Sequence, residues 1–107
     1  MDTKLFSSEK PFRVMLIGKL FRNEDFITLE SIVSRCIEEN RKEIVFDLSR
    51  MTFINSQGLG MIVKMFRIIN ESGGDLRLFK PPKDIKEIID ISGISRIIPV
   101  FSSEEDS

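Results

Sequence analysis

Apolar residues recur with the spacing of an amphipathic helix in three segments of the chain, residues 24–40, 57–72 and 83–91. In the first segment polar and charged residues fill one face, and the apolar residues of the other face are Leu29, Ile32, Val33, Cys36 and Ile37. In the second segment the corresponding apolar residues are Leu59, Ile62, Val63, Phe66 and Ile69. We expect Asn23 to cap the first helix and Gly73-Gly74 to end the second.

Short runs of β-branched and aromatic residues lie before and between these helical segments, as is typical of strands. The runs cover residues 3–6, 12–17, 43–48 and 75–80. Gly18 follows the second run and is expected to end that strand. Residues 49–52 are interpreted as a linker, and residues 97–101 form a last apolar patch that Pro99 confines to an edge strand or a loop.

The predicted order of elements is β-β-α-β-α-β-α, followed by a short last strand or helix. This order indicates an α/β fold with a mixed β-sheet, in which the later strands are parallel and the helices cover mainly one face. A chain of 107 residues suits one domain over residues 1–107, because two cores would each be too small to be stable. The acidic tail, residues 102–107, has nothing to bury and is expected to fray.

Composition excludes several classes of function. The chain has no histidine, which removes catalytic triads that need an imidazole base and the commonest zinc ligand. Its 16 basic and 17 acidic side chains are interspersed, so neither nucleic acid nor a membrane surface is an expected partner. Acidic residues in the third helical segment alternate with lysines, which favours a salt-bridged face over a metal site. We therefore expect no enzyme activity, no cofactor and no bound metal.

The same composition bears on location. Cys36 is the single cysteine, so it cannot form an internal disulfide, and its place on an apolar stripe favours a core residue of a protein in a reducing cytosol. The longest apolar runs reach four or five residues, against about 18 needed to cross a bilayer, and no secretory leader is apparent. The expected location is cytoplasmic, without membrane insertion.

The most informative polar residues open the second helical segment. Asn55 and Ser56 precede it, and Gly58 and Gly60 lie in its first turn, where each glycine costs about 1 kcal/mol relative to alanine. Two interpretations remain open at this point. The glycines could let a partner protein, or another backbone, approach the start of the helix closely. Alternatively, Ser56 could be only an N-cap and the glycines could ease packing of the helix on the sheet.

Residues 47–60, DLSRMTFINSQGLG, resemble the signature of the STAS family, the domain of bacterial anti-sigma factor antagonists, in which a strand ending in D-L-S leads to D-S-x-G-L-G. The resemblance extends through Gly73-Gly74 and the sequence ISGI at residues 91–94, and it covers roughly residues 4–101. It implies a STAS-like fold and a non-enzymatic regulator of transcription.

By position, the resemblance makes Ser56 the phosphoacceptor. It also implies a partner, an anti-sigma factor that is a serine kinase and that releases the antagonist once Ser56 is phosphorylated. A PP2C-type phosphatase is a further candidate partner. We expect the switch and partner surface to comprise Asn55, Gln57, Gly58, Gly60, Met61, Lys19, Phe21 and Arg22.

The chain departs from the family pattern at three of these positions. Asn55 replaces the acid before the phosphoacceptor, so it can cap a helix but cannot accept a proton. Lys19 and Phe21 replace both acids of a G-E-L-D sequence that the family often shows at the end of its second strand. Lys19 with Arg22 could then meet an acidic surface or the phosphate itself, or both could be solvated loop residues.

These departures keep a second function open. An unswitched STAS subunit, such as the small partner of an ABC-type lipid transporter or a stressosome-like scaffold, would have the same fold without the phosphorylation switch. An enzyme or nucleotide-binding module is disfavoured, because the Gly58-Leu59-Gly60 sequence lacks the third glycine and the acidic residue of a dinucleotide fingerprint.

Overall fold

The computed structural model of this chain describes residues 1–102. Its elements, in chain order, are β1 (Asp2–Phe6), β2 (Phe12–Leu20), α1 (Asn23–Glu38), β3 (Glu43–Asp47), β4 (Met51–Ile54), α2 (Ser56–Glu71), β5 (Asp75–Phe79), α3 (Lys83–Ile91), the 3-10 turn η1 (Ile94–Arg96) and β6 (Val100–Phe101). Within this part of the chain no helix is both long and apolar enough to cross a membrane.

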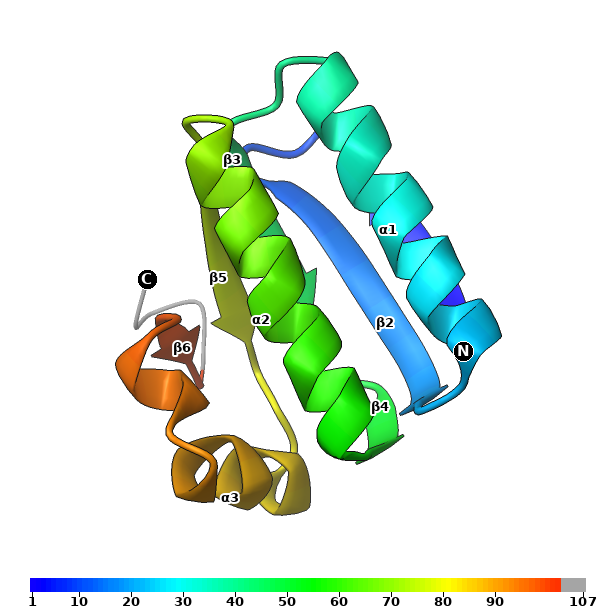
Figure 1. Cartoon of the computed structure of the whole chain (residues 1–107), viewed down its shortest axis with the longest axis vertical. Helices are drawn as coiled ribbons and strands as arrows, with labels where there is room; N and C mark the ends of the chain where they lie inside the picture. Colours follow the sequence, from blue (N-terminus) through cyan, green and yellow to red (C-terminus); the bar gives the residue numbers. More distant parts are fainter. Residues whose placement is uncertain (103–107) are drawn as a thin grey trace.

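The strands form one mixed sheet in the order β1-β2-β3-β5-β6. β1 runs antiparallel to β2, whereas the pairs β2–β3, β3–β5 and β5–β6 are parallel. Figure 1 shows α1 and α2 side by side across one face of the sheet, and α3 at the end of the molecule where α2 begins. There α3 contacts β4 and η1. The predicted α/β class, the mixed sheet and the placing of helices mainly on one face are confirmed.

The core lies between this face of the sheet and the two long helices. Alternate residues of β2, such as Val14 and Leu16, point into it and are fully buried. Cys36 and Met65 contribute from α1 and α2 with 2% and 1% of their surface exposed, so the core position expected for the cysteine is confirmed. The burial pattern of α2 differs from the predicted stripe, because Leu59, Val63 and Phe66 are only partly buried, whereas Ile62 and Ile69 are buried as predicted.

The structure contains a strand that the sequence pattern does not predict. The pattern predicts a linker over residues 49–52, but β4 begins at Met51. The prediction that Gly18 ends the second strand is wrong for the same reason. Gly18 adopts a φ of 91°, the register shifts between Gly18 and Lys19, and β2 continues to Leu20 by pairing with β4.

Two further expectations concern the ends of elements. The predicted cap of the first helix is wrong, because Arg22 holds the N-cap position and Asn23 is already helical. The last apolar patch does form an edge strand, β6, directly after Pro99. Of the tail expected to fray, Ser102 is exposed, and residues 103–107 lie outside the described residues.

The orientation of α2 gives a stability prediction. Truncation of Ile62, which is fully buried, to alanine should lower the free energy of unfolding by about 2–5 kcal/mol. Leu59→Ala and Met61→Ala should have smaller effects, because both side chains are only partly buried against the core. Denaturant unfolding of the three variants checks this order, and equal losses at all three positions would show that the helix is rotated about its axis.

Candidate functional site

The start of α2 lies against the junction between β2 and α1. Figure 1 shows that β4, the end of β2 and the first turns of α1 and α2 meet at the same end of the molecule. The Asn55 side chain links these parts. Its Oδ1 accepts a hydrogen bond from the Gly58 backbone N–H at 2.8 Å, and its Nδ2 donates to the Phe21 carbonyl oxygen at 3.4 Å. Asn55 therefore caps α2 and also ties it to the β2–α1 junction.

Ser56 is the first residue of α2, and its side chain is exposed. Because Asn55 holds the cap position, the interpretation of Ser56 as only an N-cap is wrong. The Ser56 hydroxyl is instead presented to solvent at a helix N-terminus. Backbone N–H groups that lack helical acceptors favour negative charge at this end of a helix.

The two glycines of the first turn have different surroundings. A Cβ atom on Gly58 would lie 2.5 Å from the Leu20 carbonyl oxygen and 2.8 Å from the Ile54 Cγ1, so this glycine is needed for close packing of α2 on β2. A Cβ atom on Gly60 would meet nothing within 4 Å. Tight helix-to-sheet packing thus explains Gly58, whereas Gly60 leaves open surface beside Ser56.

Residues 19–22, which follow the bulge at Gly18, form the second half of the site. Lys19 and Arg22 are exposed, Leu20 is fully buried between them, and Phe21 is half-buried. The Phe21 ring packs edge-to-face on Phe53, with ring centroids 5.8 Å apart and planes at 88°. The Arg22 guanidinium carbon lies 5.1 Å from the centroid of Phe21.

Phe53 was not among the residues predicted for this surface, although 45% of it is exposed. It pairs with Lys19 in the register of β4 and β2, and it lies three residues before Ser56. The signal that could have found it is a large apolar residue in β4 between Thr52, which is exposed, and Ile54, which is buried. That signal depends on recognising β4 as a strand.

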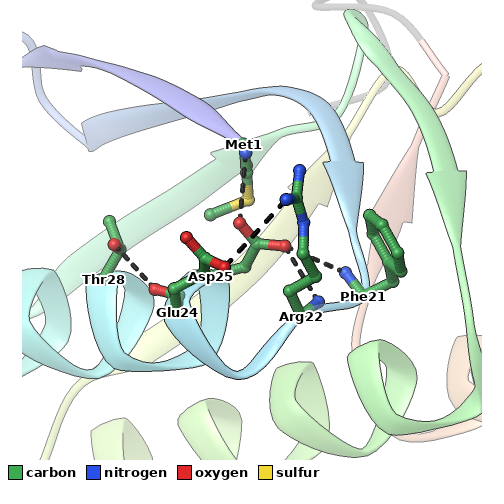
Figure 2. A network of polar contacts seen from close by, with 6 residues as sticks. All are labelled: Met1, Phe21, Arg22, Glu24, Asp25 and Thr28. Carbon is green, nitrogen blue, oxygen red and sulfur yellow. Dashed lines mark hydrogen bonds and ion pairs between the residues drawn. The ribbon is translucent and has the colours of Figure 1, made fainter.

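Asp25 holds the β2–α1 junction in place (Figure 2). This side chain is 4% exposed, and its Oδ2 accepts hydrogen bonds from the backbone N–H groups of Arg22 at 2.9 Å and Phe21 at 3.2 Å. Its Oδ1 lies 3.1 Å from the Met1 ammonium. Burial alone would raise the pKa of Asp25, but the hydrogen bonds from Arg22, Met1 and Phe21 together lower the pKa below its ordinary value.

The structure brings together most of the residues predicted for the switch surface. The Asn55–Phe21 hydrogen bond and the contact of Gly58 with Leu20 join the start of α2 to residues 19–22. Gln57 and Gly60 are exposed on the first turn, and Met61 is partly buried against the core. Among residues 1–102 no group of three acidic or thiol side chains is placed to hold a metal, and Asp90 of α3 pairs with Lys86 at 3.1 Å.

The family model of the STAS domain matches residues 16–107, which include every residue predicted for the switch surface. The chain belongs to the STAS domain family. Its fold places the signature sequence, from the end of β3 to the first turn of α2, beside the β2–α1 junction.

Similarity to individual STAS proteins agrees with this assignment. An anti-sigma F factor antagonist of Paenibacillus polymyxa is 30% identical over 93 residues, which cover 85% of this chain and 78% of that protein. The anti-sigma factor antagonist SpoIIAA in its unphosphorylated form superposes with a TM-score of 0.78 at 19% identity, covering 97% of this chain and 90% of that one. The phosphorylated form of Bacillus SpoIIAA gives a TM-score of 0.72 at 19% identity, with coverages of 97% and 94%.

The two glycines of the STAS signature provide a matched pair of variants. Gly58→Ala should destabilise the protein by about 1–3 kcal/mol, because the added methyl group meets the Leu20 backbone. Gly60→Ala should stabilise it by about 0.4–1 kcal/mol, because the methyl group enters open space and alanine favours the helix. Thermal unfolding distinguishes the two, and a loss of stability in Gly60→Ala would contradict this packing.

The lowered pKa of Asp25 indicates that the fold loses stability in acid. A carboxyl group whose pKa is lower in the folded state stabilises the fold above its unfolded pKa, near 3.9, and this contribution is lost as the pH falls through the folded pKa. Asp25→Asn should therefore lose about 1–3 kcal/mol at pH 7, since backbone donors are left poorly matched. The difference from the wild type should shrink below about pH 4. Urea unfolding at pH 7 and pH 3 measures both values, and a constant difference would contradict the ionised state of Asp25.

Proposed function

We propose that this STAS domain is an anti-sigma factor antagonist that acts in the cytoplasm and is switched by phosphorylation of Ser56. In its unmodified state it binds a serine-kinase anti-sigma factor through the start of α2 and the β2–α1 junction. The exposure of Ser56 at the first position of α2, with the capping role taken by Asn55, carries this proposal. The Paenibacillus polymyxa protein that is 30% identical to this chain is named an anti-sigma F factor antagonist, which supports this function.

The position of Ser56 favours a switch that needs no change of fold. Its hydroxyl is exposed, so a kinase can reach it, and the helix N-terminus tolerates the added negative charge. The existence of SpoIIAA in phosphorylated and unphosphorylated forms, with similar TM-scores to this chain, supports the same idea. Phosphorylation would then act at the binding surface rather than through the core.

The added charge is large enough to release a partner. A phosphate carries a charge of about −1.5 to −2 at neutral pH. At about 6 Å from one partner carboxylate and an effective dielectric constant near 20, it raises the energy of the complex by about 5 kcal/mol before salt screening. Half of that energy weakens binding well over tenfold.

A pull-down from the native cytoplasm tests the partner. The wild-type domain should recover a kinase-fold anti-sigma protein, and nucleotide in the buffer should alter the amount captured, because such a partner binds nucleotide. A PP2C-type phosphatase is a further expected partner of the phosphorylated form. Recovery of a transporter ATPase alone would support the unswitched subunit instead and would contradict the antagonist function.

The kinase recovered in the pull-down is then used to test phosphorylation of this domain. Incubation with ATP should place one phosphate on Ser56, and Ser56→Ala should abolish it while keeping the fold and partner binding. Ser56→Asp should weaken binding only in part, because one carboxylate has about half the charge of a phosphate. Intact-mass analysis and peptide mapping decide the site, and phosphate on Ser49 instead of Ser56 would show that the switch is not at α2.

Asn55 offers a second measurement on the same reaction. Asn55→Asp should speed phosphoryl transfer if a carboxylate at this position helps to place the serine or the metal-bound donor. The variant keeps the cap, because aspartate accepts a hydrogen bond from the Gly58 N–H as asparagine does. An unchanged transfer rate with unchanged partner affinity would exclude this role for an acid before Ser56.

A further inference from the structure

The β2–α1 junction and β4 together present an exposed cluster of two cations and two aromatic rings, here called the junction surface and consisting of Lys19, Phe21, Arg22 and Phe53. Its members are contiguous. Lys19 pairs with Phe53 across the two strands, the Phe53 ring packs on Phe21, and the Arg22 guanidinium lies over Phe21. The cluster adjoins the start of α2, because Asn55, the residue before Ser56, donates a hydrogen bond to the Phe21 carbonyl oxygen.

The charge of the junction surface is positive, although the whole chain has a net charge of −1. Lys19 has no ion-pair partner among residues 1–102. Arg22 faces Glu24 at 4.0 Å, but both side chains are more than half exposed, so this pair is weak. The other acid of the junction segment, Asp25, is buried and its oxygens already accept from the Met1, Phe21 and Arg22 nitrogens. Within the described residues Lys19 is therefore unpaired and Arg22 is only weakly paired.

The rings add an apolar centre to this charge. Phe53 leaves 45% of its surface in solvent, and its ring packs against Phe21 in an edge-to-face contact. Rigid aromatic and arginine side chains are the residue types that contribute most to protein interfaces. Two packed aromatic rings, one beside Lys19 in the strand register and one under Arg22, fit an apolar pocket that is bordered by carboxylates.

We propose that the partner of this protein presents an acidic face to the junction surface, with a pocket for the Phe53 ring and carboxylates that pair with Lys19 and Arg22. This inference rests on the proposed function, because it names the chemistry of the anti-sigma factor that would bind beside Ser56. An acidic partner face also increases the effect of phosphorylation on partner affinity. A phosphate on Ser56 offsets the attraction of the two cations and faces the partner's carboxylates directly.

The test compares four forms of the domain, each used as bait and as titrant: the wild type, a charge-reversed form, a control form and Phe53→Ala. The charge-reversed form carries Lys19→Glu and Arg22→Glu. The control carries the same change of charge at Arg67→Glu and Arg96→Glu, which lie on exposed positions of α2 and η1. Arg67 is eleven residues beyond Ser56, about 16 Å along the helix. Circular dichroism and thermal unfolding first establish that all forms fold alike.

Proteins captured from nuclease-treated native cytoplasm are identified by mass spectrometry, and the affinity of the captured partner is measured at 50 and 300 mM salt. The charge-reversed form should bind at least about tenfold more weakly than the wild type and the control at low salt. The wild-type affinity should fall as salt rises, and that of the charge-reversed form should not. Phe53→Ala should also weaken binding at least about tenfold, but with the salt dependence of the wild type.

The outcomes separate this inference from the proposed function. Capture of a partner without a kinase fold, but still dependent on Lys19 and Arg22, would refute the antagonist function and support the acidic partner. A kinase-fold partner that binds the charge-reversed form as well as the wild type would overturn the acidic partner and leave the antagonist function standing. The acidic partner would also be excluded if every captured protein binds the charge-reversed bait as well as the wild type. It would likewise be excluded if a protein captured from untreated cytoplasm is no longer captured after nuclease treatment.

Discussion

The close approach of α2 to the end of β2 is the contact on which the rest of the site depends. At Gly58 the helix backbone comes so near to the strand that a Cβ atom would lie 2.5 Å from the Leu20 carbonyl oxygen. The contact fixes the start of α2 beside residues 19–22, and the bulge at Gly18 turns the end of β2 toward β4. Ser56 therefore lies next to the junction surface because of backbone packing.

Two hydrogen-bonding side chains restrict the movement of the start of α2 and of the β2–α1 junction. Asn55 caps α2 and reaches the Phe21 carbonyl oxygen, while Asp25 accepts from the N–H groups of Phe21 and Arg22. The segment that carries the exposed cations is thus bound on both sides. Because Asn55 caps α2, the Ser56 side chain is not needed as the N-cap and remains available for modification. A surface that is held in place beside an exposed serine hydroxyl can be switched by charge alone.

Much of this fold follows from local sequence pattern, and what does not follow depends on contacts between distant residues. Helical periodicity placed α1, α2 and α3, and the signature at residues 47–60 located Ser56. β4 was missed because its strand character comes from pairing with β2 beyond a bulge, which no local run of residues reveals. The Asp25 network and the exposure of Phe53 were missed for related reasons, since both depend on where the chain turns after Leu20.

The most direct test of a fixed surface switched by charge is a comparison of backbone amide chemical shifts before and after phosphorylation of the isotopically labelled domain. We expect changes confined to residues 19–25 and 53–61, with the shifts of the core strands β3 and β5 unchanged. Changes spread through β3, β5 and the second half of α2 would show that phosphorylation repacks the domain, and would contradict a switch that acts by charge at a fixed surface.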